Sequence, residues 1–247
     1  MNASPFSLEN KTILITGASS GLGAATAMEC SKVGAKLILV GRNEERLNNT
    51  FTKLNGQDHI QITIDLIQEE KLNQLTKELP KLDGLVLSAG ITITKPIKFI
   101  SKDNIDEIFQ INTVSPMLLI QKLIKSKKMN SGSSVIFISS IAIAKAYLAN
   151  SIYSASKGAV NSFSKVLALE LAPRKIRSNC IEPGIIPTKM SLNGTFSEEQ
   201  LLEDEKNYPL GFGEPNDVAH GCIYLLSDAS KWVTGAVLKI DGGVTLK

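Results

Sequence analysis

The sequence predicts an α/β protein: a single doubly wound Rossmann domain with a parallel seven-stranded sheet and helices on both faces. Seven short runs rich in Ile, Val and Leu recur along the chain, and longer amphipathic stretches separate them. Strands that are apolar on both faces and alternate with helices are typical of a parallel sheet covered on both sides. The runs span residues 12–15, 37–40, 60–64, 85–87, 135–138, 177–181 and 237–240. No repeat or linker divides them, so we expect one domain over residues 1–247.

The composition argues against several classes of function. Of the 247 residues, 43% are apolar, and the net charge of +3 comes without a dense Lys/Arg run, so we expect no nucleic-acid binding. Three scattered cysteines and two distant histidines predict neither a disulfide framework nor a metal site. Residues 1–10 lack the features of a signal peptide, and no apolar run is long enough to span a membrane. We therefore expect a soluble, cytoplasmic protein.

A glycine-rich turn follows the first predicted strand. Residues 16–23 read Thr-Gly-Ala-Ser-Ser-Gly-Leu-Gly, which places glycines at Gly17, Gly21 and Gly23. Glycine allows a tight turn and a close approach of the backbone to a pyrophosphate. The N-terminus of the helix that follows offers N–H groups and partial positive charge to the same anion. The turn therefore predicts a dinucleotide site.

The end of the second predicted strand bears on which dinucleotide is bound. It reads Gly41-Arg42-Asn43, with no acidic residue before Glu44. An acid at this place binds the 2′-hydroxyl of NAD, whereas an arginine accommodates the 2′-phosphate of NADP. The pattern favours NADP(H) and leaves NAD(H) open, because Arg42 can also be the start of a solvated helix. Asp65, after the third strand, either lies near the adenine or only caps the turn.

The helix predicted from Ser101 contains Asn112 and, four residues later, Pro116. Proline has no N–H, so the carbonyl of Asn112 loses its usual partner and the helix should be irregular there. A carbonyl freed in this way can hold a water in a proton relay. The alternative is a helix that simply tolerates a proline.

The fifth predicted strand ends at Ser140, at the sheet edge where ligands of doubly wound folds bind. A helix predicted over residues 151–171 carries Tyr153 and Lys157, four residues apart and therefore on one face. A lysine cation beside a phenol favours the phenolate, so we expect Lys157 to lower the pKa of Tyr153. Alone, this spacing is usual for an ordinary helix surface. The small residues after Tyr153 make this helix a plausible subunit interface.

Residues 187–215 show no clear periodicity and predict a substrate flap at about 187–212, with a short helix around 197–207. The flap and residues 141–150 are expected to border the substrate pocket. Their apolar side chains favour a hydrophobic carbonyl compound: Ile141, Ile143, Tyr147, Leu148, Met190, Leu192 and Phe196.

Together these motifs resemble the short-chain dehydrogenase/reductase family, of the single-domain type, over essentially the whole chain. Residues 16–23 look like the family's cofactor loop, and residues 232–235 and 240–243 resemble its C-terminal segment. Asn112, Ser140, Tyr153 and Lys157 match its catalytic tetrad in order and spacing. One departure is Leu-Ser-Ala-Gly at 87–90 in place of the usual Asn-Asn-Ala-Gly, which puts local contacts in doubt but not the tetrad.

The resemblance also implies a set of cofactor-binding residues. They are Gly17, Ser19, Ser20, Gly21, Leu22, Gly23, Arg42, Asn43, Asp65, Leu66, Ser88, Ala89, Gly90, Tyr153, Lys157, Pro183, Gly184, Ile186 and Thr188. The stretch Pro183-Gly184, with Thr188 beyond it, resembles the part of the family that binds the nicotinamide carboxamide. Glu182 places a carboxylate close to this edge, and the family pattern gives no reason for it.

Within the family, the chain looks most like the 3-oxoacyl-[acyl-carrier-protein] reductases and related ketoreductases. This implies NADPH-dependent reduction of a ketone to a secondary alcohol, with an acyl carrier protein as one candidate partner near Lys128 and Arg174. Two alternatives remain open: a dehydrogenase of a sugar, steroid or small secondary alcohol, and a non-catalytic NADP-binding redox sensor. Relatives are mostly homotetramers, so we expect a homotetramer or homodimer.

Overall fold

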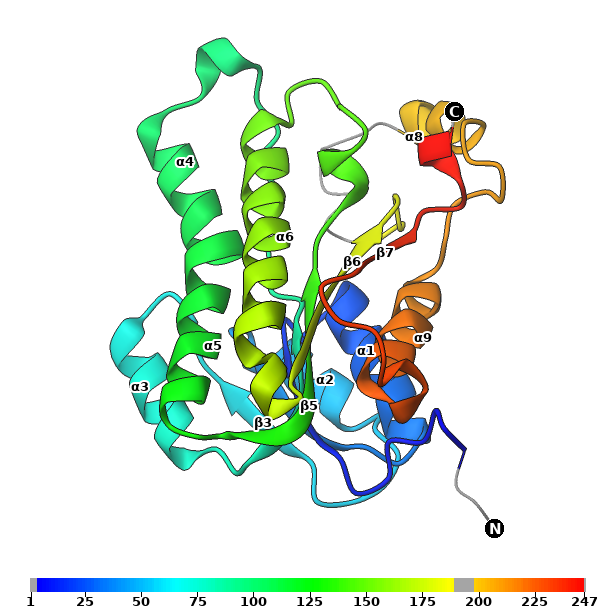
Figure 1. Cartoon of the computed structure of the whole chain (residues 1–247). Helices are drawn as coiled ribbons and strands as arrows, with labels where there is room; N and C mark the ends of the chain where they lie inside the picture. Colours follow the sequence, from blue (N-terminus) through cyan, green and yellow to red (C-terminus); the bar gives the residue numbers. More distant parts are fainter. Residues whose placement is uncertain (1–3, 189–197, 247) are drawn as a thin grey trace.

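The computed structural model describes residues 4–188 and 198–246 and contains one sheet of seven parallel strands (Figure 1). The strand order is β3-β2-β1-β4-β5-β6-β7. The strands are β1 (Thr12–Thr16), β2 (Lys36–Gly41), β3 (Ile60–Thr63), β4 (Leu82–Leu87), β5 (Met129–Ile138), β6 (Arg177–Pro183) and β7 (Val237–Ile240). All seven predicted strands and the doubly wound order are confirmed. Strands β4 and β5 begin three and six residues earlier than predicted, and β2 begins one residue earlier.

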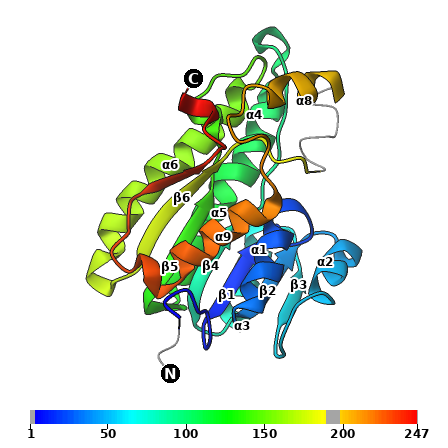
Figure 2. The same ribbon diagram turned by 90° about the vertical axis from the view of Figure 1, so that its right-hand side faces the viewer.

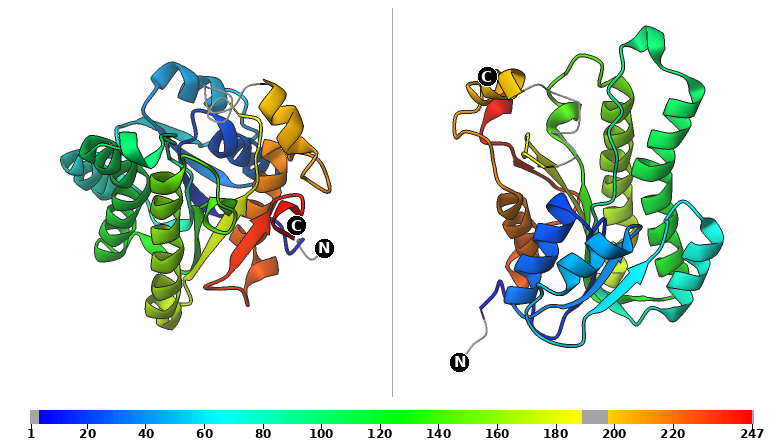
Figure 3. Two further views of the ribbon diagram at one scale, coloured as in Figure 1. Left: turned by 90° about the horizontal axis from the view of Figure 1, so that it is seen from above. Right: turned by 180° about the vertical axis from the view of Figure 1, so that it is seen from behind.

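Helices cover both faces of the sheet (Figures 1 and 2). On one face lie α1 (Gly21–Lys32), α2 (Glu44–Phe51) and α9 (Pro215–Leu226). On the other lie α3 (Glu69–Glu78), α5 (Ser115–Lys125) and α6 (Ser151–Leu171), with α4 (Lys102–Phe109) leading into α5. Seen from above, the strands run between the two helix layers (Figure 3).

Each helix layer packs on its own apolar core, and the side-chain alternation of the strands divides the residues between them. In β1, Leu14 belongs to the core under α3, α5 and α6, whereas Ile13 and Ile15 belong to the core under α1 and α9. All three are fully buried. Full burial of such a side chain contributes about 1.5–3 kcal/mol, so these cores hold the sheet and helices in fixed register.

The strand order reverses beside β1, because β2 lies on one side of it and β4 on the other. The segments that follow β1 and β4 therefore turn to opposite faces of the sheet. This divergence opens a crevice at the carboxyl edge, where ligands bind in doubly wound sheets. The loops after these two strands approach closely. A Cβ added to Gly17 would lie 2.8 Å from the backbone N and Cα of Ala89, so only glycine fits there.

The helix that contains Asn112 is irregular at the predicted place. Between α4 and α5, residues Gln110–Val114 form a π-helical turn, and the amide of Ser115 bonds the carbonyl of Gln110. Pro116 lies in the first turn of α5, where its missing N–H is tolerated. Such π turns accompany functional sites in many helices.

The described part of the flap contains α8 (Glu198–Glu205), which agrees with the short helix predicted there. Residues 189–197, and with them Met190, Leu192 and Phe196, lie outside the described residues. Within the described ranges, no helix has the length and apolar character needed to cross a membrane.

Candidate active site

The glycine-rich turn joins β1 to α1, and its glycines are required by the backbone. Gly17 and Gly21 have positive φ angles of 68° and 54°. A Cβ on Gly23 would lie 2.4 Å from the carbonyl oxygen of Gly17, so α1 packs directly on the turn. Ser20 is the N-cap residue of α1, but its side chain makes no capping bond. The first-turn N–H groups of this 12-residue helix are therefore not occupied by their own cap.

Thr16, at the end of β1, ties this turn to the end of β4. Its hydroxyl oxygen accepts hydrogen bonds from the backbone N–H groups of Ser88 at 3.1 Å and Ala89 at 3.2 Å. The side chain is 1% exposed. The sequence motif marked Thr16 only as part of a loop, because its partners lie more than 70 positions away along the chain.

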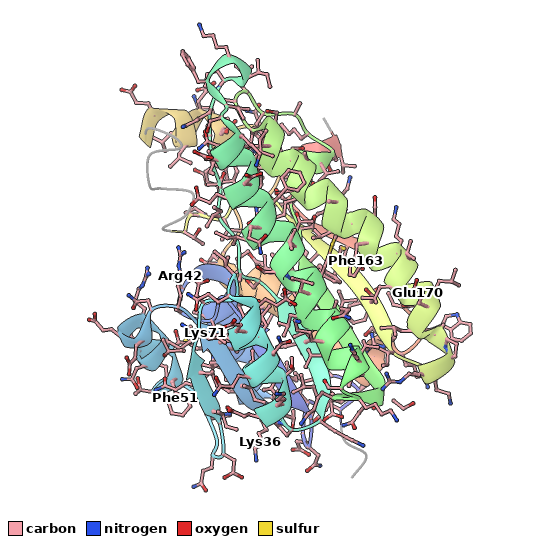
Figure 4. The ribbon with its side chains drawn as sticks, turned by 90° about the vertical axis from the view of Figure 1, so that its left-hand side faces the viewer. Lys36, Arg42, Phe51, Lys71, Phe163 and Glu170 are labelled. Atoms are coloured by element: carbon pink, nitrogen blue, oxygen red, sulfur yellow. The ribbon has the colours of Figure 1, made fainter. Side chains whose placement is uncertain are left out.

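At the end of β2, Arg42 is exposed and extends from the carboxyl side of the sheet (Figure 4). Ser19 lies next to this strand end, since its Cβ is 3.3 Å from where a Cβ on Gly41 would be. The Asn43 side chain caps α2 by accepting from the Arg46 amide at 2.9 Å. Asp65 accepts from the Ile67 amide at 3.2 Å. Asn43 and Asp65 thus have local structural roles beside the predicted cofactor role.

The buried Asn112 side chain joins three segments. Its Oδ1 accepts from the Ile91 amide at 2.8 Å, and its Nδ2 donates to the Ile91 carbonyl at 2.9 Å and to the Ser156 hydroxyl at 3.1 Å. A Cβ on Gly90 would lie 3.2 Å from Asn112 Oδ1 and 3.4 Å from Lys157 Nζ. Asn112 therefore fixes the β4 loop and α6 around the lysine.

Ser140, Tyr153 and Lys157 converge at the carboxyl edge. The hydroxyl of Ser140 lies beside that of Tyr153, close enough to act on the pKa of the phenol. Lys157 Nζ donates to the Ile138 carbonyl at 2.8 Å and lies 5.8 Å from the centre of the Tyr153 ring. Ser156, next to Lys157, donates to the Tyr153 carbonyl at 2.7 Å. The structure thus brings together all four residues of the predicted tetrad.

The electrostatics of this group differ from the prediction. Desolvation of the half-buried phenol raises the pKa of Tyr153, and the neighbouring Ser140 hydroxyl opposes this only in part. Burial lowers the pKa of Lys157 to about 8. The prediction that Lys157 holds the pKa of Tyr153 below its ordinary value is wrong for this structure. Helical spacing places the two groups near each other, but the depth at which they are buried decides the direction.

The chain after β6 completes the crevice. The Gly184 amide donates to the Ile240 carbonyl at 2.8 Å, and Ile186 is buried. The Thr188 side chain lies 3.6 Å from where a Cβ on Gly21 would be, which brings this stretch against the glycine-rich turn. Residues predicted to hold the two ends of a dinucleotide thus line one crevice.

An aromatic cluster stands beside Ser140. Tyr208 and Phe212 pack edge to face with ring centres 5.0 Å apart, and the Tyr208 hydroxyl accepts from the Ile185 amide at 3.0 Å. The cluster consists of Ile141, Tyr147, Ile185, Tyr208, Phe212 and Val244. Leu148, predicted to border the pocket, is 98% exposed and lies outside this cluster. Among the described residues, no three His, Cys, Asp or Glu side chains are placed to hold a metal ion.

Lys128 and Arg174 lie at the amino edge of the sheet, at the opposite end from Ser140. Lys128 Nζ donates to the carbonyls of Lys77 and Leu79 at the end of α3, and Arg174 donates to the Met129 carbonyl at 2.5 Å. Lys128 therefore caps a helix, as cations near a helix C-terminus commonly do.

Comparison with known proteins agrees with this architecture. Residues 17–245 match the sequence profile of the family described as enoyl-(acyl carrier protein) reductase. The chain is 34% identical to a 3-oxoacyl-[acyl-carrier-protein] reductase of Rickettsia felis, over 97% of this chain and 98% of that protein. The chain belongs to the short-chain dehydrogenase/reductase family. It is therefore an oxidoreductase that acts on CH–OH or C=O groups with NAD(P).

Other short-chain dehydrogenases/reductases are equally similar. A glucose 1-dehydrogenase of Gluconobacter oxydans is 33% identical, over 96% of this chain and 92% of that protein. A structure with bound NADP from Beutenbergia cavernae, provisionally assigned as a gluconate 5-dehydrogenase, superposes with a TM-score of 0.91 at 27% identity, covering 99% and 100% of the two chains. The relatives thus include proteins named for acyl substrates and proteins named for sugar substrates.

Proposed function

We propose that this protein reduces a ketone to a secondary alcohol, with NADPH as the reductant and Tyr153 as the general acid. The observation that carries the proposal is the placement of the Ser140 and Tyr153 hydroxyls next to each other and beside Lys157, at the same sheet edge as the glycine-rich turn. In this site Ser140 binds the carbonyl oxygen and Tyr153 donates a proton to it as negative charge develops. When bound, the cofactor supplies the hydride.

The charge states of the free site suit the reducing direction. Because the pKa of Tyr153 is raised, the phenol keeps its proton near neutral pH and has one to give. A lysine with a pKa of about 8 is mostly a cation at pH 7, so Lys157 stabilises the phenolate left after proton transfer. Asn112 positions the Lys157 side of the site through Ser156 and the β4 loop.

The residues around the crevice fit a dinucleotide, and we infer a preference for NADP(H) over NAD(H). The uncapped N-terminus of α1 suits the pyrophosphate. Arg42 is an exposed cation at the end of β2, with no acidic side chain at positions 41–43 to bind a ribose hydroxyl. The other residues proposed to contact the cofactor are those given above from the family resemblance.

For the substrate we favour a carbonyl compound with an apolar arm, such as a 3-oxoacyl thioester. The aromatic cluster beside Ser140 supports this choice, since it consists of aliphatic and aromatic side chains. The second candidate is a sugar or polyol dehydrogenase, which the similarity to a glucose 1-dehydrogenase supports.

A carrier protein is a further proposed partner. A hollow of about 420 Å³ at the amino edge is lined by Lys81, Lys125, Lys127 and Arg174, with no acidic residue, and could bind an acidic surface. The 21-residue helix α6 separates it from Ser140 by about 30 Å. A carrier protein bound there would serve the active site of a neighbouring protomer, which fits our expectation of a homodimer or homotetramer.

The test is an NADPH oxidation assay with acetoacetyl thioesters on coenzyme A and on a carrier protein, and an NADP⁺ reduction assay with glucose and gluconate. We expect thioester reduction that Tyr153→Phe lowers at least 100-fold, with the NADPH dissociation constant unchanged within about threefold. Turnover by Tyr153→Phe near that of the wild type would contradict the assignment. Tight NADPH binding without turnover of any of these substrates would contradict both substrate candidates.

A further inference from the structure

Lys145 is a half-buried cation on the segment that follows Ser140. A 3₁₀ turn at Ile141–Ile143 begins directly after Ser140, and the backbone N–H of Lys145 donates to the Ile141 carbonyl at 2.8 Å. The backbone turn therefore continues to Lys145 and fixes its place relative to the serine. Ile141 also belongs to the aromatic cluster, so the same turn joins Ser140 to that cluster.

The Lys145 ammonium lies against two rings of the aromatic cluster. Its Nζ is 5.7 Å from the centre of the Tyr147 ring and 5.9 Å from the centre of the Tyr208 ring. A cation within about 6 Å of the centre of a tyrosine ring is attracted by the π electrons of that ring. Two such contacts hold the end of a flexible side chain near one place, which reduces the entropy that Lys145 loses when it binds a ligand.

Tyr208 connects this cation to the part of the crevice that is expected to hold the nicotinamide. A Cβ on Gly184 would lie 3.0 Å from Tyr208 Cε1, and the Tyr208 hydroxyl accepts from the Ile185 amide at 3.0 Å. The Tyr208 side chain therefore packs on the segment that follows β6. Lys145 thus lies where the turn that begins at Ser140 meets the segment after β6.

The charges around the cluster decide which kind of ligand suits Lys145. Among the described residues, Lys145 makes no ion pair. Burial raises the pKa of both tyrosines, and Asp204 and Asp241 add to this effect, so both carboxylates lie near the cluster. The Asp241 carboxylate accepts from the Gly243 and Thr245 amides and from the Thr245 hydroxyl. One cation with two acids in its neighbourhood favours a ligand with a single negative charge over a dianionic phosphate.

We propose that Lys145 is a specificity-determining residue that binds a carboxylate of the substrate, at the end of an arm that lies along the aromatic cluster. The substrate class is an oxo acid, whose carbonyl reaches Ser140 and Tyr153 while its carboxylate reaches Lys145. In a thioester substrate, an acyl chain that ends in a carboxylate gains the same contact. The inference rests on the proposed ketone reduction and names a second group that the site recognises. A charge-assisted bond at this place positions the carbonyl and takes no part in the proton transfer.

The test compares oxo acids with their methyl esters, because the ester keeps the carbonyl and removes the charge. The probes are acetoacetate, 4-oxopentanoate and 5-oxohexanoate, which separate the carbonyl from the carboxylate by increasing lengths. For at least one length, we expect the wild type to have a kcat/KM for the acid about 10- to 100-fold above that for the ester, as a hydrogen bond between charged groups provides. A higher kcat/KM for dihydroxyacetone phosphate than for every acid would contradict the carboxylate.

Lys145→Met removes the charge and keeps a side chain of similar length. It should lower kcat/KM for the preferred acid about 10- to 100-fold, mainly through KM, and leave that for the methyl ester within about threefold. Lys145→Arg keeps the charge and should retain the preference for the acid. The matched control is Lys98→Met, the same change at an exposed lysine whose Nζ lies 4.9 Å from the centre of the Phe99 ring, outside the cluster. This control should leave the preference for the acid unchanged.

An equal loss for acid and ester in Lys145→Met would overturn the inference, because Lys145 would then have only a structural role. A wild type that prefers no acid over its ester would overturn it as well. Neither result affects the proposed ketone reduction, which turnover of the esters reports independently.

If no ketone is reduced, binding of the acids to the protein with NADPH, measured by ligand-observed NMR titration, replaces turnover. A dissociation constant that Lys145→Met raises at least about tenfold, and Lys98→Met does not, would support the carboxylate site although the proposed reduction fails. The same dissociation constant in Lys145→Met and in the wild type would refute both.

Discussion

Lys157 should destabilise the protein near neutral pH and cease to do so at high pH. The side chain is 6% exposed, and burial lowers its pKa from 10.5 to about 8. A difference of this size corresponds to about 3 kcal/mol of unfavourable interaction with the charged form. Between pH 8 and about 10.5 the unfolded lysine binds a proton that the folded one has released, so the free energy of unfolding rises with pH in this window. Below pH 8 the full penalty remains.

Lys157→Met isolates this effect, because methionine fills a similar volume without a charge. The variant also loses the bond from Nζ to the Ile138 carbonyl, which costs about 1 kcal/mol with little dependence on pH. We therefore expect the variant to be more stable than the wild type at pH 7 by about 2 kcal/mol. This advantage should shrink by about 3 kcal/mol by pH 10.5.

The assay is urea unfolding of both proteins at pH 7, 8, 9 and 10, followed by circular dichroism. Lys165→Met is the matched control, because Lys165 is exposed on the same helix. A difference between Lys157→Met and the wild type that stays constant from pH 7 to pH 10 would refute the reasoning. Catalytic activity of Lys157→Met should be lost throughout.

Three other substitutions test individual contacts. Arg42→Ala should raise the dissociation constant of NADPH at least tenfold more than that of NADH in fluorescence titrations; equal affinity of the wild type for both would contradict the proposed 2′-phosphate contact. Asn112→Ala leaves the buried amide and carbonyl of Ile91 without partners and should lower the free energy of unfolding, measured in urea, by about 3 kcal/mol. A loss below about 1 kcal/mol would show that Asn112 does not hold the β4 loop in place. Thr16→Val keeps the shape of the side chain but removes the acceptor for the Ala89 amide, so it should lower the free energy of unfolding by about 2 kcal/mol in the same assay and weaken NADPH binding. Unchanged NADPH binding would contradict this role of Thr16.

The sequence predicted the strands wherever the residues were uniformly apolar, and it missed strand residues that are polar. Asp83 interrupts the apolar run of β4, yet its carboxylate accepts from the Thr12 amide at 2.9 Å and from Asn130 at 2.7 Å. Ser134 lies in β5 because its hydroxyl donates to the Leu225 carbonyl of α9 at 2.7 Å. These partners lie from 47 to 91 positions away. No local pattern can reveal them, so β4 and β5 were predicted too short.

The same limit applies to the candidate site. Spacing along α6 was enough to place Tyr153 and Lys157 on one face, and strand ends were enough to place Ser140 beside them. The spacing of residues along a helix does not show how deeply each side chain is buried, however, and this burial decides whether the pKa of Tyr153 is raised or lowered. The spacing also does not show which distant groups a side chain bonds, so the hydrogen bonds of Thr16 to the end of β4 and of Asn161 to Glu182 became visible only in the structure.

The apolar packing of α6 explains how the buried Lys157 side chain is held in place. A buried lysine with about 3 kcal/mol of penalty cannot be kept by its own single hydrogen bond, which contributes about 1 kcal/mol. The same helix buries Val160, Leu167 and Leu171 in the core it shares with α5, and each contributes about 1.5–3 kcal/mol. The apolar half of α6 therefore offsets the cost of the half that carries Tyr153 and Lys157. It follows that truncating Leu167 should weaken the whole helix, and the placement of Lys157 with it, although Leu167 lies nearly three turns from Lys157 and nearly four from Tyr153.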